Sequence, residues 1–135
     1  MFDQANAQRR DPITDWVIRG GICLLFFLFG MDKFPNGSQW VAFFAQIGLG
    51  QWFRYFTGIV EIAGALLVLI PRTITAGLVL LASAMAGAAA VHIFVMHHPG
   101  NAVIPSVFLA GLVLFGLQRR SRLSAMPVPS SGARE

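Results

Sequence analysis

The chain has 135 residues, of which 56% are hydrophobic and 12% are charged. Soluble domains carry about twice that charged fraction, so the composition excludes an ordinary soluble protein and predicts one integral membrane domain. The formal net charge of +4 does not indicate nucleic-acid binding, because the basic residues stand at the ends of apolar segments, where they set topology.

The first apolar segment, residues 13–31, is long enough to span a bilayer and follows a polar tail over residues 1–12. Arg19 lies near its beginning, where we expect its long side chain to reach the lipid headgroups. The segment is predicted to end at residues 32–38, because Pro35 and the Asn-Gly pair that follows it break helices.

A second apolar segment, residues 39–48, is too short to cross a membrane. Large apolar side chains recur in it at helical spacing, which predicts an amphipathic helix lying in the membrane interface. These side chains are Trp40, Phe43, Phe44 and Ile47.

Three more spanning segments are predicted in the rest of the chain. The second span covers residues 52–70 and is ended by a Pro-Arg pair. The third covers residues 73–95, and its small residues at 82–90 predict a central position in the bundle, since small residues let helices pack closely in lipid. The fourth covers residues 102–117, and a basic tail that we expect to be disordered occupies residues 119–135.

Together these segments predict an all-α fold, a bundle of four transmembrane helices over residues 13–118 with a short interfacial helix between helices 1 and 2. With four spans both termini lie on one side, together with eight of the ten basic residues. Cytoplasmic segments are enriched in basic residues, so we expect cytoplasmic termini in a bacterial inner membrane. The basic residues of that side are Arg9, Arg10, Arg19, Arg72, Arg119, Arg120, Arg122 and Arg134.

Ionisable residues in and near the spans identify a candidate site. Glu61 lies about 10–13 Å along the second span from either end, where a carboxylate is costly and needs a partner or a wet cavity. The predicted topology places Lys33, Arg54, His92 and Asn101 in the same outer half of the bundle. We therefore expect these groups to converge, with Lys33, Arg54 or His92 pairing with Glu61.

Two interpretations of Glu61 are open: an ion-pair strut that fixes helix register, or a ligand or proton site. His92 is likewise either a packing histidine or a ligand. All three histidines come from one helix and its loop, so no second helix supplies a cross-bundle haem ligand, and no metal site is expected. A single cysteine, Cys23, excludes an intrachain cysteine pair.

Aromatic residues near the outer end of the bundle indicate what such a site could hold. These rings could line a pocket for a flat ligand such as a quinone. The candidate lining residues are two aromatic residues, Trp40 and Phe43, and two polar residues, Arg54 and Asn101. The alternative is that the aromatic rings face lipid or pack against one another.

The order of several short motifs along the chain resembles that in the DoxX-like family of small bacterial membrane proteins. The resemblance implies a four-helix membrane protein. Some relatives act as the membrane subunit of a thiosulfate:quinone oxidoreductase, and others are membrane anchors in redox complexes. It also implies that Lys33, Glu61 and His92 are the polar positions of the family. The matching residues are Arg19, the Gly-Met-Asp-Lys-Phe motif at 30–34, Trp40, Phe43, Gly48, the Gly-Ile-Val-Glu-Ile-Ala-Gly motif at 58–64, Pro71, Arg72 and residues 85–92.

Three functions are hypotheses at this point. The first is a membrane subunit of a redox assembly, in which Glu61, Lys33 and His92 bind a quinone headgroup or handle its protons while a redox partner protein exchanges the electrons. The second is a non-enzymatic membrane anchor or assembly factor, in which the Glu61 and Lys33 side chains are structural. The third, a small-solute carrier, would need an oligomer, because no internal repeat is evident between the two halves of the chain.

Overall fold

The computed structural model describes residues 11–124, and all regular secondary structure in this range is helical. This confirms the predicted all-α fold, including a short helix between the first two long helices. The elements in chain order are α1 (Pro12–Met31), α2 (Gln39–Ile47), α3 (Gln51–Leu69), α4 (Ile74–Ala90), the π-helix η1 (Val91–Val95), the 3₁₀-helix η2 (Pro99–Ala102) and α5 (Val103–Ser124).

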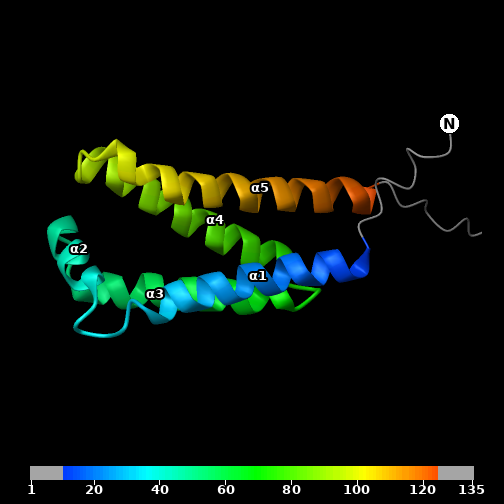
Figure 1. Ribbon diagram of the computed structural model, residues 1–135, viewed down its shortest axis with the longest axis horizontal. Coiled ribbons are helices and arrows are strands. Elements are labelled where there is room, and N and C mark those ends of the chain that lie inside the picture. The colour runs from blue at the N-terminus through cyan, green and yellow to red at the C-terminus, as the bar shows by residue number, and fades with distance from the viewer. Residues whose placement is uncertain (1–10, 125–135) are drawn as a thin grey trace, which may run out of the picture.

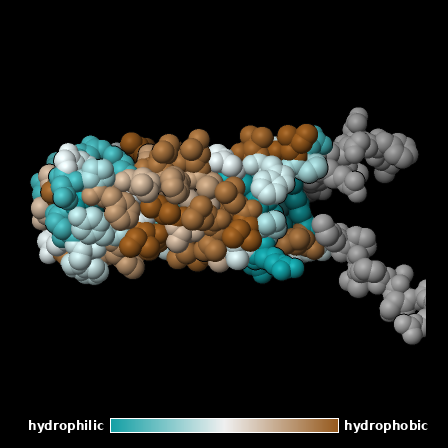
Figure 2. Space-filling view, turned by 90° about the horizontal axis from the view of Figure 1, so that it is seen from below, coloured by the Kyte–Doolittle hydropathy of each residue, from teal (hydrophilic) through white to brown (hydrophobic). Residues whose placement is uncertain are grey.

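Four helical stretches are long and apolar enough to cross a membrane: Pro12–Met31, Gln51–Leu69, Ile74–Val95 and Pro99–Ser124. Their outward faces carry large apolar side chains, such as Leu24 of α1, which is 62% exposed. Figure 2 shows an apolar band across the middle of the molecule, with hydrophilic residues gathered toward both ends. A bilayer would cover this band, and an apolar surface of this extent is rare on soluble monomeric proteins.

The two ends of the bundle contain different elements (Figure 1). The start of α1, the turn at residues 70–73 and the end of α5 lie together at what we call the terminal end. The helices α2, η1 and η2 lie at the opposite end, which we call the α2 end. α2 is held on the start of α3, because the side-chain amide of Gln51 donates to the main-chain carbonyl of Val41 at 3.0 Å.

α4 packs against both α3 and α5, and α3 packs against both α1 and α4, so α4 shares the centre of the bundle with α3 and does not occupy it alone as the sequence predicted. The close contact with α3 comes from glycines: a Cβ on Gly77 would lie 2.7 Å from the Val68 amide nitrogen and 2.8 Å from the Gly64 carbonyl oxygen. The small residues at 82–90 contribute less than predicted, and a Cβ on Gly87 would meet no atom within 4 Å. The buried core consists of Phe26, Ala65, Val68, Ile74, Leu78, Leu81, Met85, Leu112 and Phe115.

The later helix ends differ from the predicted bounds. The third span finishes as the π-helix η1, and α5 continues to Ser124, past the predicted end at residue 117. The apolar run stops at that point, but the polar residues that follow are good helix formers, and arginine is favourable at a helix C-terminus. The tail predictions for residues 1–10 and 125–135 lie outside the described residues.

Candidate functional site

A buried ion pair joins α1 and α3 near the α2 end. Lys33 lies just after the end of α1, and its Nζ is 2.6 Å from Oε2 of Glu61 in α3. Both residues are only 4% exposed. The ammonium also donates to the main-chain carbonyl of Phe29 at 3.3 Å. Of the three partners considered for Glu61, lysine is therefore the one in contact, and each charge offsets the burial cost of the other.

Two glycines bring the helices close enough for this pair to form. A Cβ on Gly30 of α1 would lie 2.8 Å from the carbonyl oxygen of Gly58 in α3, so no larger residue fits without moving the helices. At Gly58 the Cβ position is 3.4 Å from the Cβ of Lys33. Glu61 is three residues further along α3, on the same face, and it meets the lysine there.

Trp40 of α2 covers the lysine. The Lys33 Nζ lies 4.4 Å from the centre of the Trp40 ring, within the range of a cation–π contact. The indole Nε1 donates to Oδ2 of Asp32 at 2.6 Å, which fixes the orientation of the ring. The short helix thus carries an aromatic side chain directly over the buried ion pair.

A second aromatic contact links α2 to the end of α4. The rings of Trp40 and Phe43 have their centres 5.6 Å apart, and the Phe43 ring is 5.2 Å from the ring of His92. His92 is half-buried in the π-helix η1, and its Nδ1 is buried without a hydrogen-bond partner among the described residues. π-Helical turns are frequent at functional sites, and a buried nitrogen without a partner is costly unless it has a use.

Arg54 lies beside this chain of contacts and does not face Glu61. It is 1% exposed, and its guanidinium donates to the main-chain carbonyls of Lys33, Phe34 and Pro35, which directly follow α1. Further bonds go to Asn36 Oδ1 at 3.3 Å and to the hydroxyl of Tyr55 at 2.9 Å. Arg54 therefore holds the loop after α1 in place.

The structure thus brings together five of the seven candidate residues in one line of contacts and leaves two apart from it. The line runs from Glu61 through Lys33, Trp40 and Phe43 to His92. Arg54 touches only the main chain of this line, and Asn101 is exposed in η2 with no side-chain contact to it. No group of three or more His, Cys, Asp or Glu side chains within residues 11–124 could hold a metal ion.

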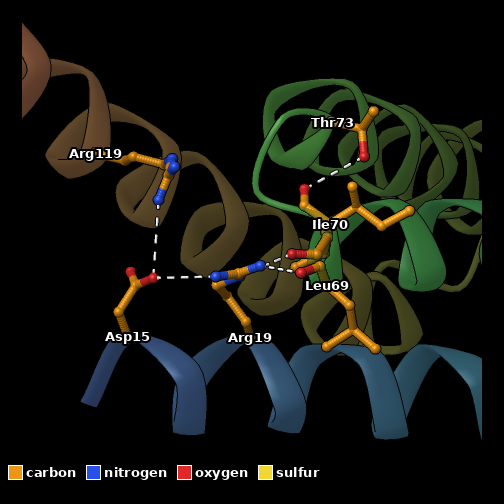
Figure 3. A network of polar contacts seen from close by, with 7 residues as sticks. Asp15, Arg19, Leu69, Ile70, Thr73 and Arg119 are labelled. Atoms are coloured by element: carbon orange, nitrogen blue, oxygen red, sulfur yellow. Dashed lines mark hydrogen bonds and ion pairs between the residues drawn. The ribbon is translucent and has the colours of Figure 1, made fainter. Parts of the chain in front are cut away.

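Sequence reasoning misjudged Arg19, which does not reach the headgroups but is 3% exposed. Figure 3 shows its guanidinium between Asp15 and the last turn of α3. It donates to the carbonyls of Val68, at 2.9 Å, and Leu69, and its charge is 3.6 Å from Asp15. These carbonyls have no partner within α3, and the negative end of the helix dipole favours a cation. The sequence carries no signal for this role, because the partners of Arg19 are main-chain atoms at the end of another helix.

Arg19 and Arg54 form a reciprocal pair between antiparallel helices. Arg19 of α1 binds carbonyls at the C-terminal end of α3, and Arg54 of α3 binds the carbonyls that follow the C-terminal end of α1. Buried polar contacts therefore join the two helices at the terminal end, through Arg19, and near the α2 end, through Arg54 and the Lys33–Glu61 ion pair. These contacts fix the position of α1 relative to α3 along the axis of the bundle.

The helical architecture and the buried charges define a multi-pass α-helical membrane protein. A comparison with sequence models of protein families matches residues 17–115 to the DoxX-like family. The match covers most of the chain and includes every candidate site residue, so the chain belongs to the DoxX-like family. No curated protein and no solved structure matches it.

Proposed function

We propose that this chain is the membrane subunit of a quinone-linked redox assembly, and that the quinone headgroup binds at the α2 end beside His92. The observation that carries the proposal is the buried Nδ1 of His92, which has no hydrogen-bond partner within residues 11–124 and lies at one end of a line of aromatic rings. The other end of that line is the Lys33–Glu61 pair. Flat aromatic surface next to a few placed polar groups is typical of sites for small ring ligands.

The side chains suit a ligand that releases or takes up protons. Oxidation of a hydroquinone yields a quinone, two electrons and two protons. The imidazole of His92 can accept a proton from a ring hydroxyl or donate a hydrogen bond to a ring carbonyl, while the Phe43 face supports the ring. A redox partner protein is the proposed acceptor or donor of the electrons. In this assembly the present chain contributes binding, orientation and proton transfer.

Quinone binding to the purified protein tests this proposal, with quenching of tryptophan fluorescence as the readout, since Trp40 lies in the proposed site. The informative variant is His92→Phe, which keeps a ring against Phe43 and removes both nitrogens. Because Nδ1 has no partner to lose, this variant should fold as well as the wild type. The matched control is His98→Gln, which changes an exposed histidine of the same loop region.

We expect saturable binding to the wild type and to His98→Gln, and at least a tenfold weaker affinity for His92→Phe, about the effect of one lost hydrogen bond to a buried group. Equal binding by all three proteins would refute the site. An absence of binding in the wild type would refute the proposed function.

The second candidate function is a membrane anchor for a partner protein, with the ion pair as a strut. It is favoured by the closure of the pair: the side chains of Lys33 and Glu61 are each 5% exposed and already satisfy one another at 2.6 Å. In that case the single variants Lys33→Met and Glu61→Leu change the stability of the protein and nothing else. The partner protein is then found by cross-linking of the intact complex.

We also propose a bacterial inner membrane location with both termini cytoplasmic, supported by the excess of arginine at the terminal end. The test uses Cys23→Ser as the background and one added cysteine, at Gln46 or at Ser124, both of which are exposed. A membrane-impermeant maleimide should label Gln46→Cys in intact spheroplasts and Ser124→Cys only after permeabilisation. The reverse pattern would contradict the orientation.

A further inference from the structure

Three arginines at the terminal end have no carboxylate partner within residues 11–124. Arg72 is exposed in the turn between α3 and α4, and Arg120 is exposed near the end of α5. Arg122, one turn or less from the end of α5, is half-buried. None of the three forms an ion pair in this part of the chain. Their charges are therefore available to an external anion.

The carboxylate at the centre of this end is already shared. Asp15 Oδ2 lies 3.6 Å from Arg19 and 3.8 Å from Arg119, so one negative charge serves two arginines, as Figure 3 shows. Asp11 is exposed and is the only other acidic residue of this end among those described. Within residues 11–124 the terminal end therefore carries an excess of positive charge that the described carboxylates do not neutralise.

Each of the three arginines is close in sequence to an exposed large apolar side chain, as expected of cationic residues at the edge of a membrane-spanning bundle. Ile70, two residues before Arg72, is 51% exposed, and Leu117 and Leu123, which flank Arg120 and Arg122 in α5, are 57% and 59% exposed. Trp16, in the first part of α1, is 54% exposed. Lipid tails would cover these side chains, which we call the apolar rim, and Figure 2 shows hydrophilic surface toward the terminal end of the apolar band. Cationic side chains at this boundary meet lipid phosphates and not the hydrocarbon.

We propose that Arg72, Arg120 and Arg122 form a binding surface for anionic phospholipid headgroups in the leaflet at the terminal end. Guanidinium groups bind phosphate oxygens through two parallel hydrogen bonds, and a lipid with a net negative charge neutralises them where a zwitterionic lipid does not. The apolar rim supplies the surface for the acyl chains of the same lipid. An acidic segment of a protein would satisfy the charges but would leave this rim without a function.

The test compares binding of fluorescent phosphatidylglycerol and phosphatidylcholine, with the same acyl chains, to the full-length protein in a neutral detergent. We expect the wild type to prefer phosphatidylglycerol, and the preference to fall as salt is added. The variant R72Q/R120Q/R122Q should lose about fivefold of this preference per arginine, the usual contribution of a basic residue near an anionic surface. The matched control R72K/R120K/R122K keeps the charges and should keep most of the preference.

Each outcome decides the proposal. Equal binding of the two lipids by the wild type overturns it, and so does a glutamine variant that is folded by circular dichroism and retains the preference. A lysine variant that loses the preference would overturn the electrostatic account. Arginine-dependent binding of an acidic peptide without a lipid preference would assign the surface to a protein partner instead.

Discussion

The Lys33–Glu61 pair gives a prediction whose magnitude follows from the structure. Glu61→Leu leaves the ammonium of Lys33 buried, with the Phe29 carbonyl at 3.3 Å and the Trp40 ring at 4.4 Å as its remaining partners. Lys33→Met leaves the carboxylate buried without its cation. Each single change should lower the free energy of unfolding by about 3–5 kcal/mol, the usual cost of leaving one charge of a buried pair alone.

The double variant Lys33→Met/Glu61→Leu removes both charges and fills similar volume with apolar atoms. It should be within about 1 kcal/mol of the wild type, because a hydrophobic replacement of a buried ion pair is often neutral. The coupling between the two positions is the sum of the two single losses less the loss in the double variant, and it is therefore predicted to be at least about 5 kcal/mol. Reversible unfolding in mixed detergent micelles, followed by far-ultraviolet circular dichroism, measures all four proteins under one condition.

A double variant that loses as much stability as the two single variants together would refute the reasoning, because it would mean that the two side chains do not stabilise one another. The double variant also separates the proposed functions. If it is stable and still binds quinone, the ion pair is a strut and His92 alone defines the ligand site. If it is stable and no longer binds, the charges belong to the ligand site.

Two further predictions concern how α1 and α3 are joined. Gly30→Ala should destabilise the fold by about 1–3 kcal/mol through overpacking, because the new Cβ would lie 2.6 Å from the Ile62 side chain and 2.8 Å from the Gly58 carbonyl oxygen. In the matched control Gly87→Ala the new Cβ meets no atom within 4 Å, so this variant should be neutral or stabilising in the same unfolding measurement. Arg19→Gln and Arg54→Gln should each cost about 1–3 kcal/mol by leaving carbonyls unpaired. The two variants are compared in a Trp16→Phe background, because the Arg19 guanidinium lies 4.2 Å from the centre of the Trp16 ring. In that background only Arg54→Gln should shift the tryptophan emission, since it alone frees the loop that leads to Trp40, and identical spectra for the two variants would contradict this.

The number and type of helices could be predicted from the sequence because hydrophobic runs of sufficient length have one stable form in lipid. The position of Glu61 in such a run also predicted correctly that it needs a partner. The choice of Lys33 over Arg54 or His92 could not be predicted, because it depends on the close approach at Gly30 and Gly58. That approach is a property of two helices together, and neither segment contains it alone.

The roles of the arginines were less predictable for a related reason. Hydropathy treats an arginine near a helix end as a residue that reaches for water, which is correct for Arg72 and Arg120. Arg19 and Arg54 are buried because unpaired carbonyls of a neighbouring helix end lie within reach, and those partners are main-chain atoms without a sequence signal. The end of α5 was placed too early because apolarity, and not helix propensity, was used to define it.

The reciprocal contacts between α1 and α3 also bear on how the protein is made. During synthesis α1 enters the membrane first, carrying Arg19 and Lys33. The carbonyls that bind Arg19 and the carboxylate that neutralises Lys33 belong to α3, which the ribosome has still to produce. We expect α1 to be retained at the insertion machinery until α3 emerges, and the two helices to move into lipid as one unit. A nascent chain that ends after α2 should then be a substrate for membrane proteases, and its stable insertion would show that α1 is accepted by lipid alone.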